Sequence, residues 1–340
     1  MVSAILEGKP DKNLILVTGR IHPKLAEDVA EQLGIDVLET TAYDFANGEM
    51  YVRYTESVRG ADVFMLQSHY KPINKAIMEQ LIMIDALKRA SARSITAVCP
   101  LVGYSRQDKK HRGREPISCR LVFDLLKTAG ADRIMSVDLH AAQSQGFFDG
   151  PVDHLVAMPV LVDYIRDRFQ GHLDNVAVVS PDAGRIRVAE QWAQRLGGGP
   201  LAFVHKTRDI TRPNQVVANR VVGDVAGKDC VLVDDLIDTA GTIAGACHVL
   251  QDAGAKSVTV VATHGVLSGP AIERLKNCGA REVVLTDTVP IPEEKRWDGL
   301  TVLSIAPLLA SAIRAVFKDG SVAELFDTYP EHHGQGFLFA

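Results

Sequence analysis

The sequence predicts an α/β protein built from two similar, doubly wound domains, each with a mainly parallel sheet flanked by helices. Three observations support this prediction. The 340 residues exceed the size of a usual single core, short apolar runs alternate with longer helical patterns, and two parts of the chain resemble each other at one fixed offset. Hydrophobic residues form 46% of the chain and aromatic residues 6%, which suits an aliphatic α/β core better than an aromatic-rich β-sandwich.

The expected elements follow one another in an alternating order. Apolar runs of strand length occupy residues 14–17, 63–66, 95–98 and 134–137. Longer stretches with apolar residues at helical spacing include residues 23–33 and 75–90. Such alternation predicts parallel strands with helices on both faces of the sheet.

An internal repeat explains why two similar domains are expected. Residues 14–34 align with residues 177–197 without a gap, and residues 86–105 align with residues 249–268 at the same offset of 163. Generic strand-helix units share some residues by chance, but chance does not favour one register twice. Duplication is therefore the better account.

The repeat also places the domain boundary, which we expect near residues 150–158. The N-terminal domain is expected to span residues 1–153 and the C-terminal domain residues 154–306. The last segment, residues 307–340, is expected to pack back on the N-terminal domain.

The charge balance argues against a nucleic-acid partner. The formal net charge is −5, whereas a protein that binds nucleic acid normally needs a basic face. Basic residues cluster locally instead, within residues 106–114 and 206–212. Such runs are commonly solvated faces, but their place in Gly- and Pro-marked segments between apolar strands favours a functional role.

The cysteines and the N-terminus indicate the compartment. None of the five cysteines has a CxxC spacing, and most lie in apolar or helical stretches, which predicts reduced, buried thiols. The N-terminus lacks a basic segment followed by an apolar run, and no apolar stretch approaches membrane-spanning length. We therefore expect a cytoplasmic protein with no membrane partner.

The most informative segment is the acidic turn VDDLIDTAGT, residues 233–242. It follows a predicted buried strand and precedes an apolar helical pattern, so it lies at the carboxyl edge of a sheet, where α/β proteins bind ligands. Asp234 and Asp235 can accept hydrogen bonds from vicinal sugar hydroxyls, and Asp238 adds charge that serves a cation or shapes the turn. Amides and hydroxyls suited to a phosphate come from Thr239, Ala240, Gly241 and Thr242.

A helix cap is the simpler interpretation of these residues, since Asp and Thr are good N-cap residues. A cap needs only one of them, and three acids around one short loop repel each other unless a sugar, a metal or basic groups offset their charge. The segment is not a Walker A loop, because the lysine of GxxxxGK[ST] is absent. The pattern favours a phosphorylated ribose ligand.

An acidic pair followed by DTAGT resembles the phosphoribosyl pyrophosphate binding motif of type I phosphoribosyltransferases and of ribose-phosphate pyrophosphokinases. Other segments separate these two families. Several segments of this chain resemble the pyrophosphokinases. They are GYSRQDK at 103–109 with REPIS at 114–118, VDLHAAQSQGFFD at 137–149, VSPDAG at 179–184 and LSGPA at 267–271. The resemblance is collinear from about residue 13 to residue 326. The chain is thus identified as a ribose-phosphate pyrophosphokinase of the phosphate-activated, bacterial class with two phosphoribosyltransferase-like domains.

The resemblance implies an ATP site in two parts. Arg106 and Gln107 match residues that hold the phosphates and the adenine of ATP. Three residues of this chain match family residues that contact adenine from a neighbouring subunit: Phe45, Asn47 and Glu49. Without the resemblance, residues 46–49 indicate only a hairpin turn, since Asn-Gly is a strong turn signal.

The resemblance also implies Mg²⁺ as the cofactor. His140 and Asp182 match residues that contact the Mg²⁺ carried by ATP. Taken alone, His140 is more commonly a structural residue. Because Mg²⁺ prefers oxygen ligands and keeps several waters, we expect a contact of His140 to be weak or shared with Asp182.

The implied reaction transfers the pyrophosphoryl group of MgATP to the anomeric hydroxyl of ribose 5-phosphate. The products are phosphoribosyl pyrophosphate, which serves nucleotide, His and Trp biosynthesis, and AMP. Lys206 and Arg208 match the catalytic pair on the family's mobile loop, and cations there would stabilise the charge that develops on the transferring group. Pro213 and Asn214 are consistent with a loop that closes over the site.

The resemblance further implies a homo-oligomer, a hexamer built from dimers, with inorganic phosphate as activator. The allosteric site between subunits is matched by Ser57, Arg59, Arg114 and Asp153. Two departures stand out. The tail reads SVAELF at residues 321–326, where the family commonly has SVSYLF, and Arg185 replaces a usual glycine and adds a cation near the ribose site.

Two rival functions remain at this point. A non-catalytic regulatory subunit could dispense with Lys206, Arg208 or His140, and this chain retains all three. A base-transferring phosphoribosyltransferase would need no ATP and would release pyrophosphate instead of AMP. Formation of AMP separates all three possibilities.

Overall fold

The computed structural model describes residues 12–208 and 216–327. This part of the chain forms two compact units. The N-terminal unit comprises residues 12–136, 144–154 and 306–327, and the C-terminal unit comprises residues 137–143, 155–208 and 216–305.

The N-terminal unit is built on a five-stranded sheet with the order β1-β4-β5-β6-β7. The neighbours β1 and β4, β4 and β5, and β5 and β6 pair in parallel, as the alternating pattern predicts. The strands are β1 (Leu14–Thr18), β4 (Asp62–Leu66), β5 (Ser94–Cys99), β6 (Arg133–Val137) and β7 (Val152–Leu155). A separate antiparallel hairpin joins β2 (Thr40–Asp44) to β3 (Met50–Tyr54).

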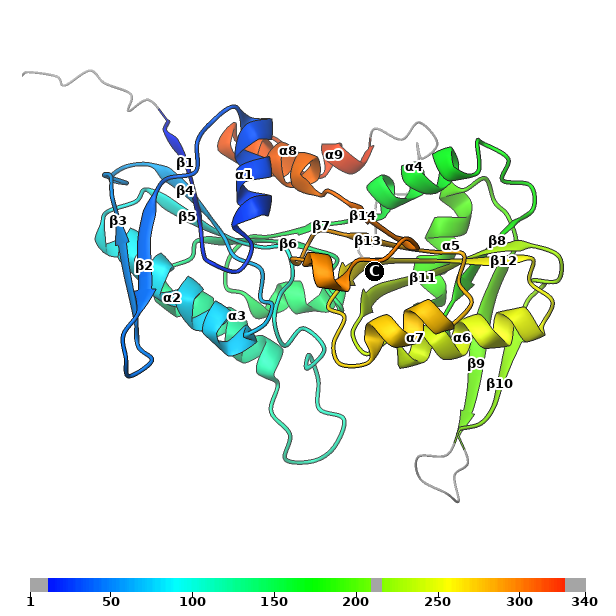
Figure 1. The fold of residues 1–340 in the computed structure, drawn as a ribbon. Coiled ribbons are helices and arrows are strands. Elements are labelled where there is room, and N and C mark those ends of the chain that lie inside the picture. The colour runs from blue at the N-terminus through cyan, green and yellow to red at the C-terminus, as the bar shows by residue number, and fades with distance from the viewer. Residues whose placement is uncertain (1–11, 209–215, 328–340) are drawn as a thin grey trace, which may run out of the picture. The chain divides into compact units, whose positions relative to one another are not determined.

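Helices cover both faces of this sheet (Figure 1). Helix α1 packs against α8 on one face, and α2 packs against α3 on the other. The apolar spacing of α1 buries Leu25, Ala26, Val29 and Ala30 on a single side. The helices are α1 (Pro23–Leu33), α2 (Ile73–Arg89), α3 (Ser118–Ala129) and α8 (Ala306–Phe317), followed by the short α9 (Glu324–Asp327).

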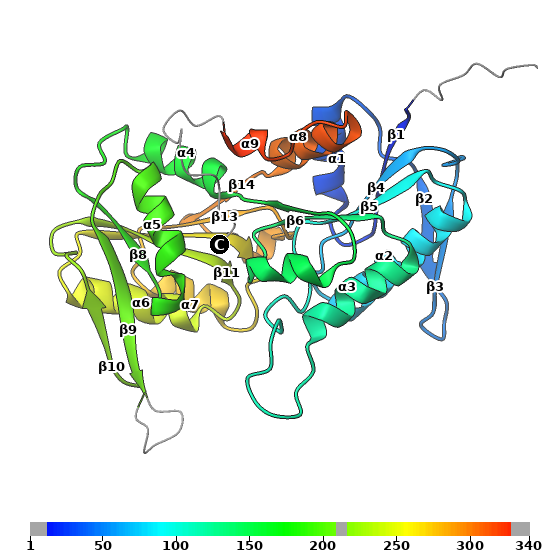
Figure 2. The same ribbon diagram turned by 180° about the vertical axis from the view of Figure 1, so that it is seen from behind.

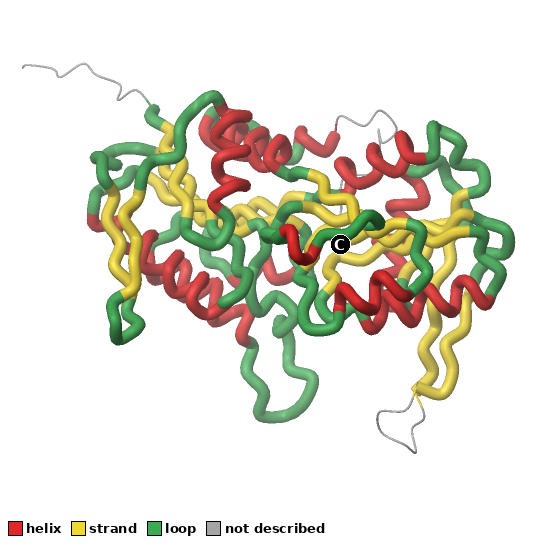
Figure 3. Tube along the Cα trace, in the orientation of Figure 1, coloured by secondary structure: helices red, strands yellow, loops and turns green. Residues whose placement is uncertain are grey.

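The C-terminal unit has a seven-stranded sheet with the order β10-β9-β8-β11-β12-β13-β14. All neighbours pair in parallel except β9 and β10, which form an antiparallel hairpin at one edge (Figure 3). Its strands are β8 (Val176–Ser180), β9 (Leu201–Arg208), β10 (Val216–Val222), β11 (Asp229–Ile237), β12 (Ser257–Gly265), β13 (Glu282–Thr286) and β14 (Leu300–Leu303).

Two pairs of helices sandwich this second sheet (Figure 2). Helices α4 and α5 lie on one face and α6 and α7 on the other. Their bounds are α4 (Met158–Arg168), α5 (Ile186–Arg195), α6 (Gly241–Asp252) and α7 (Ala271–Asn277), and short 3-10 turns lie at η1 (Ala142–Phe147), η2 (Ala183–Arg185) and η3 (Glu293–Lys295).

The two sheets repeat the same core order, because β1-β4-β5-β6 corresponds to β8-β11-β12-β13. The ion pairs at the strand starts repeat as well. Asp62 accepts hydrogen bonds from Arg93 and Ser94, and 167 residues further on, Asp229 accepts them from Lys256 and Ser257. Shared detail of this kind supports the predicted duplication.

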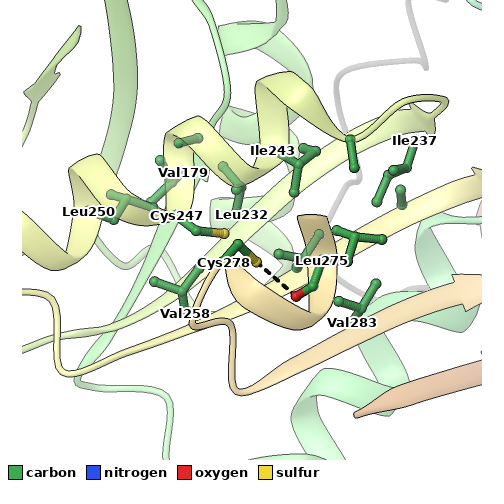
Figure 4. Packing of buried hydrophobic residues seen from close by; sticks show 14 of the residues in the cluster. Val179, Leu232, Ile237, Ile243, Cys247, Leu250, Val258, Leu275, Cys278 and Val283 are labelled. Atoms are coloured by element: carbon green, nitrogen blue, oxygen red, sulfur yellow. Dashed lines mark hydrogen bonds between the residues drawn. The ribbon is translucent and has the colours of Figure 1, made fainter. Parts of the chain in front are cut away.

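Aliphatic side chains and small residues fill the core of the C-terminal unit (Figure 4). Leu232, Val258 and Val283 come from neighbouring strands and pack with Ile243 and Leu250 of α6. The five cysteines are all buried and form no disulfide, which confirms the prediction of buried thiols. Within residues 12–208 and 216–327, no helix is long and apolar enough to cross a membrane.

Packing of this core gives the first prediction. Val260 of β12 is fully buried, and we expect Val260→Ala to lower the free energy of unfolding by about 2 kcal/mol, because two methyl groups leave a close-packed interior. Val222→Ala, at an exposed position of the edge strand β10, should change it by less than about 0.5 kcal/mol. Denaturant unfolding measures both, and equal losses would contradict this account of the core.

Candidate active site

The acidic segment lies at the predicted junction of a strand and a helix, and it spans the end of β11 and the start of α6. The strand is longer than predicted, because β11 continues to pair with β12 through Ile237 and Gly265. Asp234 and Asp235 therefore belong to the end of the strand itself, with Asp234 opposite Ala262. Pairing with the neighbouring strand overrides the weak strand preference of two adjacent acids.

The segment that contains LSGPA holds the turn in place. The backbone N–H groups of Leu267 and Ser268 donate to the carbonyl oxygens of Ile237 and Asp238, at 3.1 and 2.8 Å. Arg274 donates to the carbonyl oxygen of Thr239 at 2.9 Å. These donors use the carbonyl side of the turn, whereas the N–H groups of the first turn of α6 have no acceptor within the helix.

The conformation of the turn suits a phosphate. Ala240 has a left-handed φ of 58° immediately before α6, while Thr239, Gly241 and Thr242 are exposed. The helix N-terminus therefore presents unpaired N–H groups and two exposed hydroxyls, a common arrangement for binding anions. Asp238, half-buried, lies just before these groups.

Four charged or polar side chains meet at the end of β11. Asp235 Oδ2 lies 2.8 Å from His140 Nδ1 and 2.5 Å from Arg185 Nη2. Arg185 Nε lies 3.7 Å from Asp234 Oδ1, and Nη2 also donates to the carbonyl oxygen of His140 at 3.2 Å. The structure thus brings together His140, Asp234 and Asp235, and adds Arg185 to them.

The protonation of His140 follows from these contacts. Nδ1 lies 2.8 Å from Asp235 and 2.9 Å from Arg185 Nη2, and one ring nitrogen cannot donate to the first and accept from the second at once. The carboxylate is the stronger partner, so Nδ1 carries its hydrogen toward Asp235. When the ring is neutral, this leaves Nε2 as the nitrogen that can bind a ligand.

The two carboxyl groups differ in acidity. Burial raises the pKa of Asp234 well above its usual range, and the adjacent charge of Asp235 adds to this effect. Burial would also raise the pKa of Asp235, but the hydrogen bond from His140 and the charge of Arg185 outweigh burial and lower it. Asp235 therefore holds the negative charge more firmly than Asp234 does.

The donors on the ATP side suit a metal that arrives with phosphates. Asp182 keeps one carboxylate oxygen on the N–H of Gly184 at 2.8 Å, and His140 offers Nε2. A histidine whose other ring nitrogen donates to a carboxylate is typical of metal sites. Across residues 12–208 and 216–327, no group of three or more His, Cys, Asp or Glu side chains is placed to enclose a metal. Mg²⁺ bound by one or two side chains and by substrate phosphates fits this donor set.

The half-buried Asp138 and the buried His264, which the sequence did not single out, hold the segment that carries His140. Asp138 accepts from the hydroxyl of Thr263 at 2.6 Å and from the N–H of Ala157 at 3.1 Å. His264 Nε2 lies 3.1 Å from the carbonyl oxygen of Val137. The sequence offered one signal for Asp138 and His264: both are polar residues at the end of an apolar run, in VDLH and in ATHG.

The predicted ATP loop follows β5 in the N-terminal unit. Arg106 and Gln107 are exposed there, and Gln107 joins the loop to α3 because its carbonyl oxygen accepts from the N–H of Cys119 at 3.2 Å. Tyr104, with a left-handed φ of 62°, donates through its hydroxyl to Asn74 at 2.5 Å. The loop is therefore fixed at both ends while its functional side chains face outward.

A buried histidine that the sequence did not single out anchors the start of this loop. His69 Nδ1 accepts from the N–H of Gly103 at 2.9 Å, and Nε2 lies 2.7 Å from Gln80 Oε1. Burial lowers the pKa of His69 to about 4, although its bond to Gln80 opposes this shift. The ring is therefore neutral, with its proton on Nε2, and its acceptor nitrogen holds Gly103.

The predicted hairpin turn at residues 46–49 is confirmed. The N–H of Phe45 donates to the carbonyl oxygen of Glu49 at 2.7 Å, and the N–H of Glu49 donates to Asn47 Oδ1 at 3.1 Å. Phe45, Tyr43 and Tyr51 form an exposed aromatic group on the hairpin, with the two tyrosine rings stacked at 4.9 Å. No hydrogen bond in the described part of the chain joins Phe45, Asn47 or Glu49 to Gln107 of the ATP loop.

The residues expected at the allosteric site lie in the N-terminal unit, and among the described residues only Ser57 and Arg59 bond to each other. Ser57 accepts from the N–H of Arg59 at 3.4 Å. Asp153 pairs with Arg133 at 2.8 Å, and Arg114 is an exposed residue with a φ of 68°. Burial raises the pKa of Asp153, against the effect of Arg133.

Lys206 and Arg208 fall at the end of β9, where they pair with Asn219 and Val216 of β10. Their side chains lie outside the described part of the structure, as do Pro213 and Asn214 altogether.

Comparisons with known proteins agree on one family. A model described as the N-terminal domain of ribose phosphate pyrophosphokinase matches residues 14–130, and one described as a phosphoribosyl synthetase-associated domain matches residues 201–327. A ribose-phosphate pyrophosphokinase of Bifidobacterium longum is 98% identical over 340 residues, the full length of both chains. Another from Corynebacterium efficiens is 65% identical over 316 residues, 93% of this chain and 96% of its own.

A solved structure agrees with the fold. The crystal structure of phosphoribosylpyrophosphate synthetase from Mycobacterium smegmatis superposes with a TM-score of 0.86 at 63% identity. The match covers 91% of this chain and all of the other. The two phosphoribosyltransferase-like domains predicted from the sequence are thereby confirmed.

The neutral state of His69 predicts a pH dependence of stability. The unfolded imidazole has a pKa of about 6.5, above the folded value of about 4, so the unfolded chain takes up a proton first as the pH falls. The stability that His69 contributes is complete above about pH 6.5 and is lost between pH 6.5 and 4. We expect the stability advantage of the wild type over His69→Gln to be smaller at pH 5 than at pH 7 by about 2 kcal/mol.

Denaturant unfolding at the two pH values tests this expectation. His172→Gln is the matched control, because His172 is exposed, and its difference from the wild type should not change with pH. A gap for His69→Gln that stays constant or widens at pH 5 would contradict a neutral, buried His69.

Proposed function

The chain belongs to the ribose-phosphate pyrophosphokinase family, and from this premise we propose how its own residues carry out the reaction. The enzyme transfers the pyrophosphoryl group of ATP to the anomeric hydroxyl of ribose 5-phosphate, giving 5-phosphoribosyl 1-pyrophosphate and AMP. The observation that carries the assignment of the acceptor site is the acid pair at the end of β11, directly before the N-terminus of α6.

The acceptor half of the site lies on this strand-to-helix junction. Asp234 and Asp235 accept hydrogen bonds from the vicinal hydroxyls of the ribose. The N–H groups and hydroxyls of residues 239–242 bind the 5-phosphate, which the partial positive charge of the helix N-terminus favours. The sugar is therefore held at two ends, which fixes the direction in which its anomeric hydroxyl points.

The donor half of the site binds ATP with its Mg²⁺. We assign the phosphates and adenine to Arg106 and Gln107, and the second contact with adenine to Phe45, Asn47 and Glu49 of a neighbouring subunit. His140 Nε2 and Asp182 would hold the Mg²⁺ that accompanies ATP, and such an ion would supply neutralisation of the charge on the phosphates.

The chemistry is an in-line displacement. The anomeric oxygen forms a bond to the β-phosphorus of ATP, the bond from that phosphorus to the bridging oxygen of the α-phosphate breaks, AMP leaves with that oxygen, and the hydroxyl proton is released. Lys206 and Arg208 stabilise the charge on the transferring group. Positioning and charge stabilisation carry the reaction, since no side chain is assigned as a covalent nucleophile.

We also propose that the enzyme acts as a homo-oligomer, a hexamer built from dimers. Apolar side chains recur on the exposed side of α3 at Ile117, Leu121 and Leu125, and Met78 of the contacting helix α2 is exposed as well. Leu121 and Met78 are 58% and 51% exposed, which is unusual for a surface that stays in water. Covering by a second copy removes this apolar surface and brings a second hairpin to the site.

We also propose how the enzyme is regulated and where in the cell it works. Inorganic phosphate acts as activator at a site formed by Ser57, Arg59, Arg114 and Asp153 between subunits. The protein works in the cytoplasm. The domain limits of residues 1–153 and 154–306, with residues 307–340 returning to the first domain, likewise remain predictions.

The reaction is tested by incubating the protein with ribose 5-phosphate and MgATP and measuring both products. We expect AMP and phosphoribosyl pyrophosphate to appear in equal amounts and chelation of Mg²⁺ to stop the reaction. Lys206→Ala should lower kcat by on the order of 10²–10³-fold without a change in the affinity for ribose 5-phosphate. Lys318→Ala, which removes an exposed lysine elsewhere, should leave kcat unchanged.

Each other outcome points to another function. A protein that forms no AMP here, but releases pyrophosphate when given phosphoribosyl pyrophosphate and a base, is a base-transferring enzyme. A protein that binds both substrates without turnover is a regulatory subunit. Normal turnover in Lys206→Ala would remove Lys206 from the catalytic pair.

Self-association has its own test on helix α3. Leu121→Asp places a charge in the exposed apolar row, and we expect sedimentation velocity to show a smaller species than the wild type. Thr128→Asp adds the same charge at an exposed polar position of the same helix and should sediment like the wild type. An unchanged species for Leu121→Asp would exclude this row from the subunit interface.

A further inference from the structure

Arg185 lies on the two carboxylates that the proposed function assigns to the ribose. Its guanidinium is 2.5 Å from Asp235 Oδ2, and its Nε is 3.7 Å from Asp234 Oδ1. The same group donates to the carbonyl oxygen of His140. One side chain thus contacts both acids of the acceptor half and the residue assigned to the metal of ATP.

These contacts use the acceptor atoms that a substrate needs. Asp235 Oδ2 faces both His140 and Arg185, and Asp234 Oδ1 accepts the N–H of Asp235 at 2.9 Å. The side chain of Arg185 is itself only 19% exposed, so it fills the space in front of the acids. A sugar hydroxyl or a cation that approaches the acids must compete with it.

Charge explains why this contact forms. The side chains of Asp234 and Asp235 are 15% and 9% exposed, and adjacent buried carboxylates both repel each other and lose hydration. Among the ion pairs of residues 12–208 and 216–327, only those of Arg185 reach both acids. Since a guanidinium does not release its proton in proteins, the compensation lasts until the side chain moves.

We propose that Arg185 is a built-in counter-ion of the acceptor site, which occupies Asp234 and Asp235 in the substrate-free enzyme and is displaced when ribose 5-phosphate and its accompanying cation bind. This inference rests on the proposed function, which assigns the acid pair to the ribose. Arg185 stands where the family pattern usually has glycine, which has no side chain to fill this role. The consequence is that the free enzyme binds a divalent cation weakly at the acid pair, and the metal enters together with substrate phosphates.

Binding of Mn²⁺ to the substrate-free, full-length protein tests this role. Mn²⁺ prefers the same oxygen ligands as Mg²⁺, and electron paramagnetic resonance measures its free concentration directly. We expect Arg185→Ala to bind Mn²⁺ on the order of tenfold more tightly than the wild type, because a competing charge next to buried carboxylates is gone. Arg185→Gln, which keeps a long polar side chain without the charge, should show the same gain and serves if Arg185→Ala does not fold.

Two controls locate the effect. Arg187→Ala removes one positive charge from an exposed position two residues away and should bind Mn²⁺ like the wild type. Adding Asp235→Asn to Arg185→Ala should abolish the gain. The proposal is overturned if Arg185→Ala binds Mn²⁺ no more tightly than the wild type, if Arg187→Ala gains equally, or if the gain survives Asp235→Asn.

The test is separate from that of the reaction. AMP formation by the wild type decides the proposed function, whereas the Mn²⁺ titration contains no substrate. An active wild type without a gain in Arg185→Ala rejects the counter-ion role alone. An inactive wild type rejects the function, whatever the titration shows.

Discussion

Two adjacent carboxylates end a buried parallel strand, and neither can keep a charge there without a partner. Asp234 and Asp235 belong to β11, which pairs with β12 along this stretch and with β8 only as far as Leu232. His140 and Arg185 come from two other segments and supply the compensation. The position of both segments follows from this need, since an uncompensated pair of buried charges would cost several kcal/mol.

The two halves of the duplicated scaffold differ at this place, because only the C-terminal half has a carboxylate there that needs a charged partner. The strand starts are alike, because Asp62 pairs with Ser94 in the register of β4 and β5, as Asp229 does with Ser257 in β11 and β12. The fifth residue after Asp62 is Gln67, and the fifth residue after Asp229 is Asp234. Gln67 is neutral and fully buried, and its amide donates to Glu79 within the protein.

The N-terminal half therefore uses its carboxyl edge for support, and the C-terminal half uses the same edge for a ligand. The buried Gln67 bonds to Glu79, and the buried His69 bonds to Gln80 and holds the loop that begins at Gly103. Exposed and half-buried charges lie on that loop. If the proposed sites are correct, the two substrates bind at equivalent edges of the two sheets, one supported by internal hydrogen bonds and the other charged.

The sequence by itself determined the α/β class, the duplication, the junction before α6 and the hairpin turn at Asn47, because periodicity and turn chemistry act over a few neighbouring residues. Only the tertiary structure decided that β11 extends through Asp235, since strand pairing with β12 is a long-range interaction. It alone also placed Arg185 on the acid pair and His69 beneath the ATP loop. A single buried histidine, or an arginine after a Gly, carries no local signal of its partner, because that partner is set by the fold and lies many residues away.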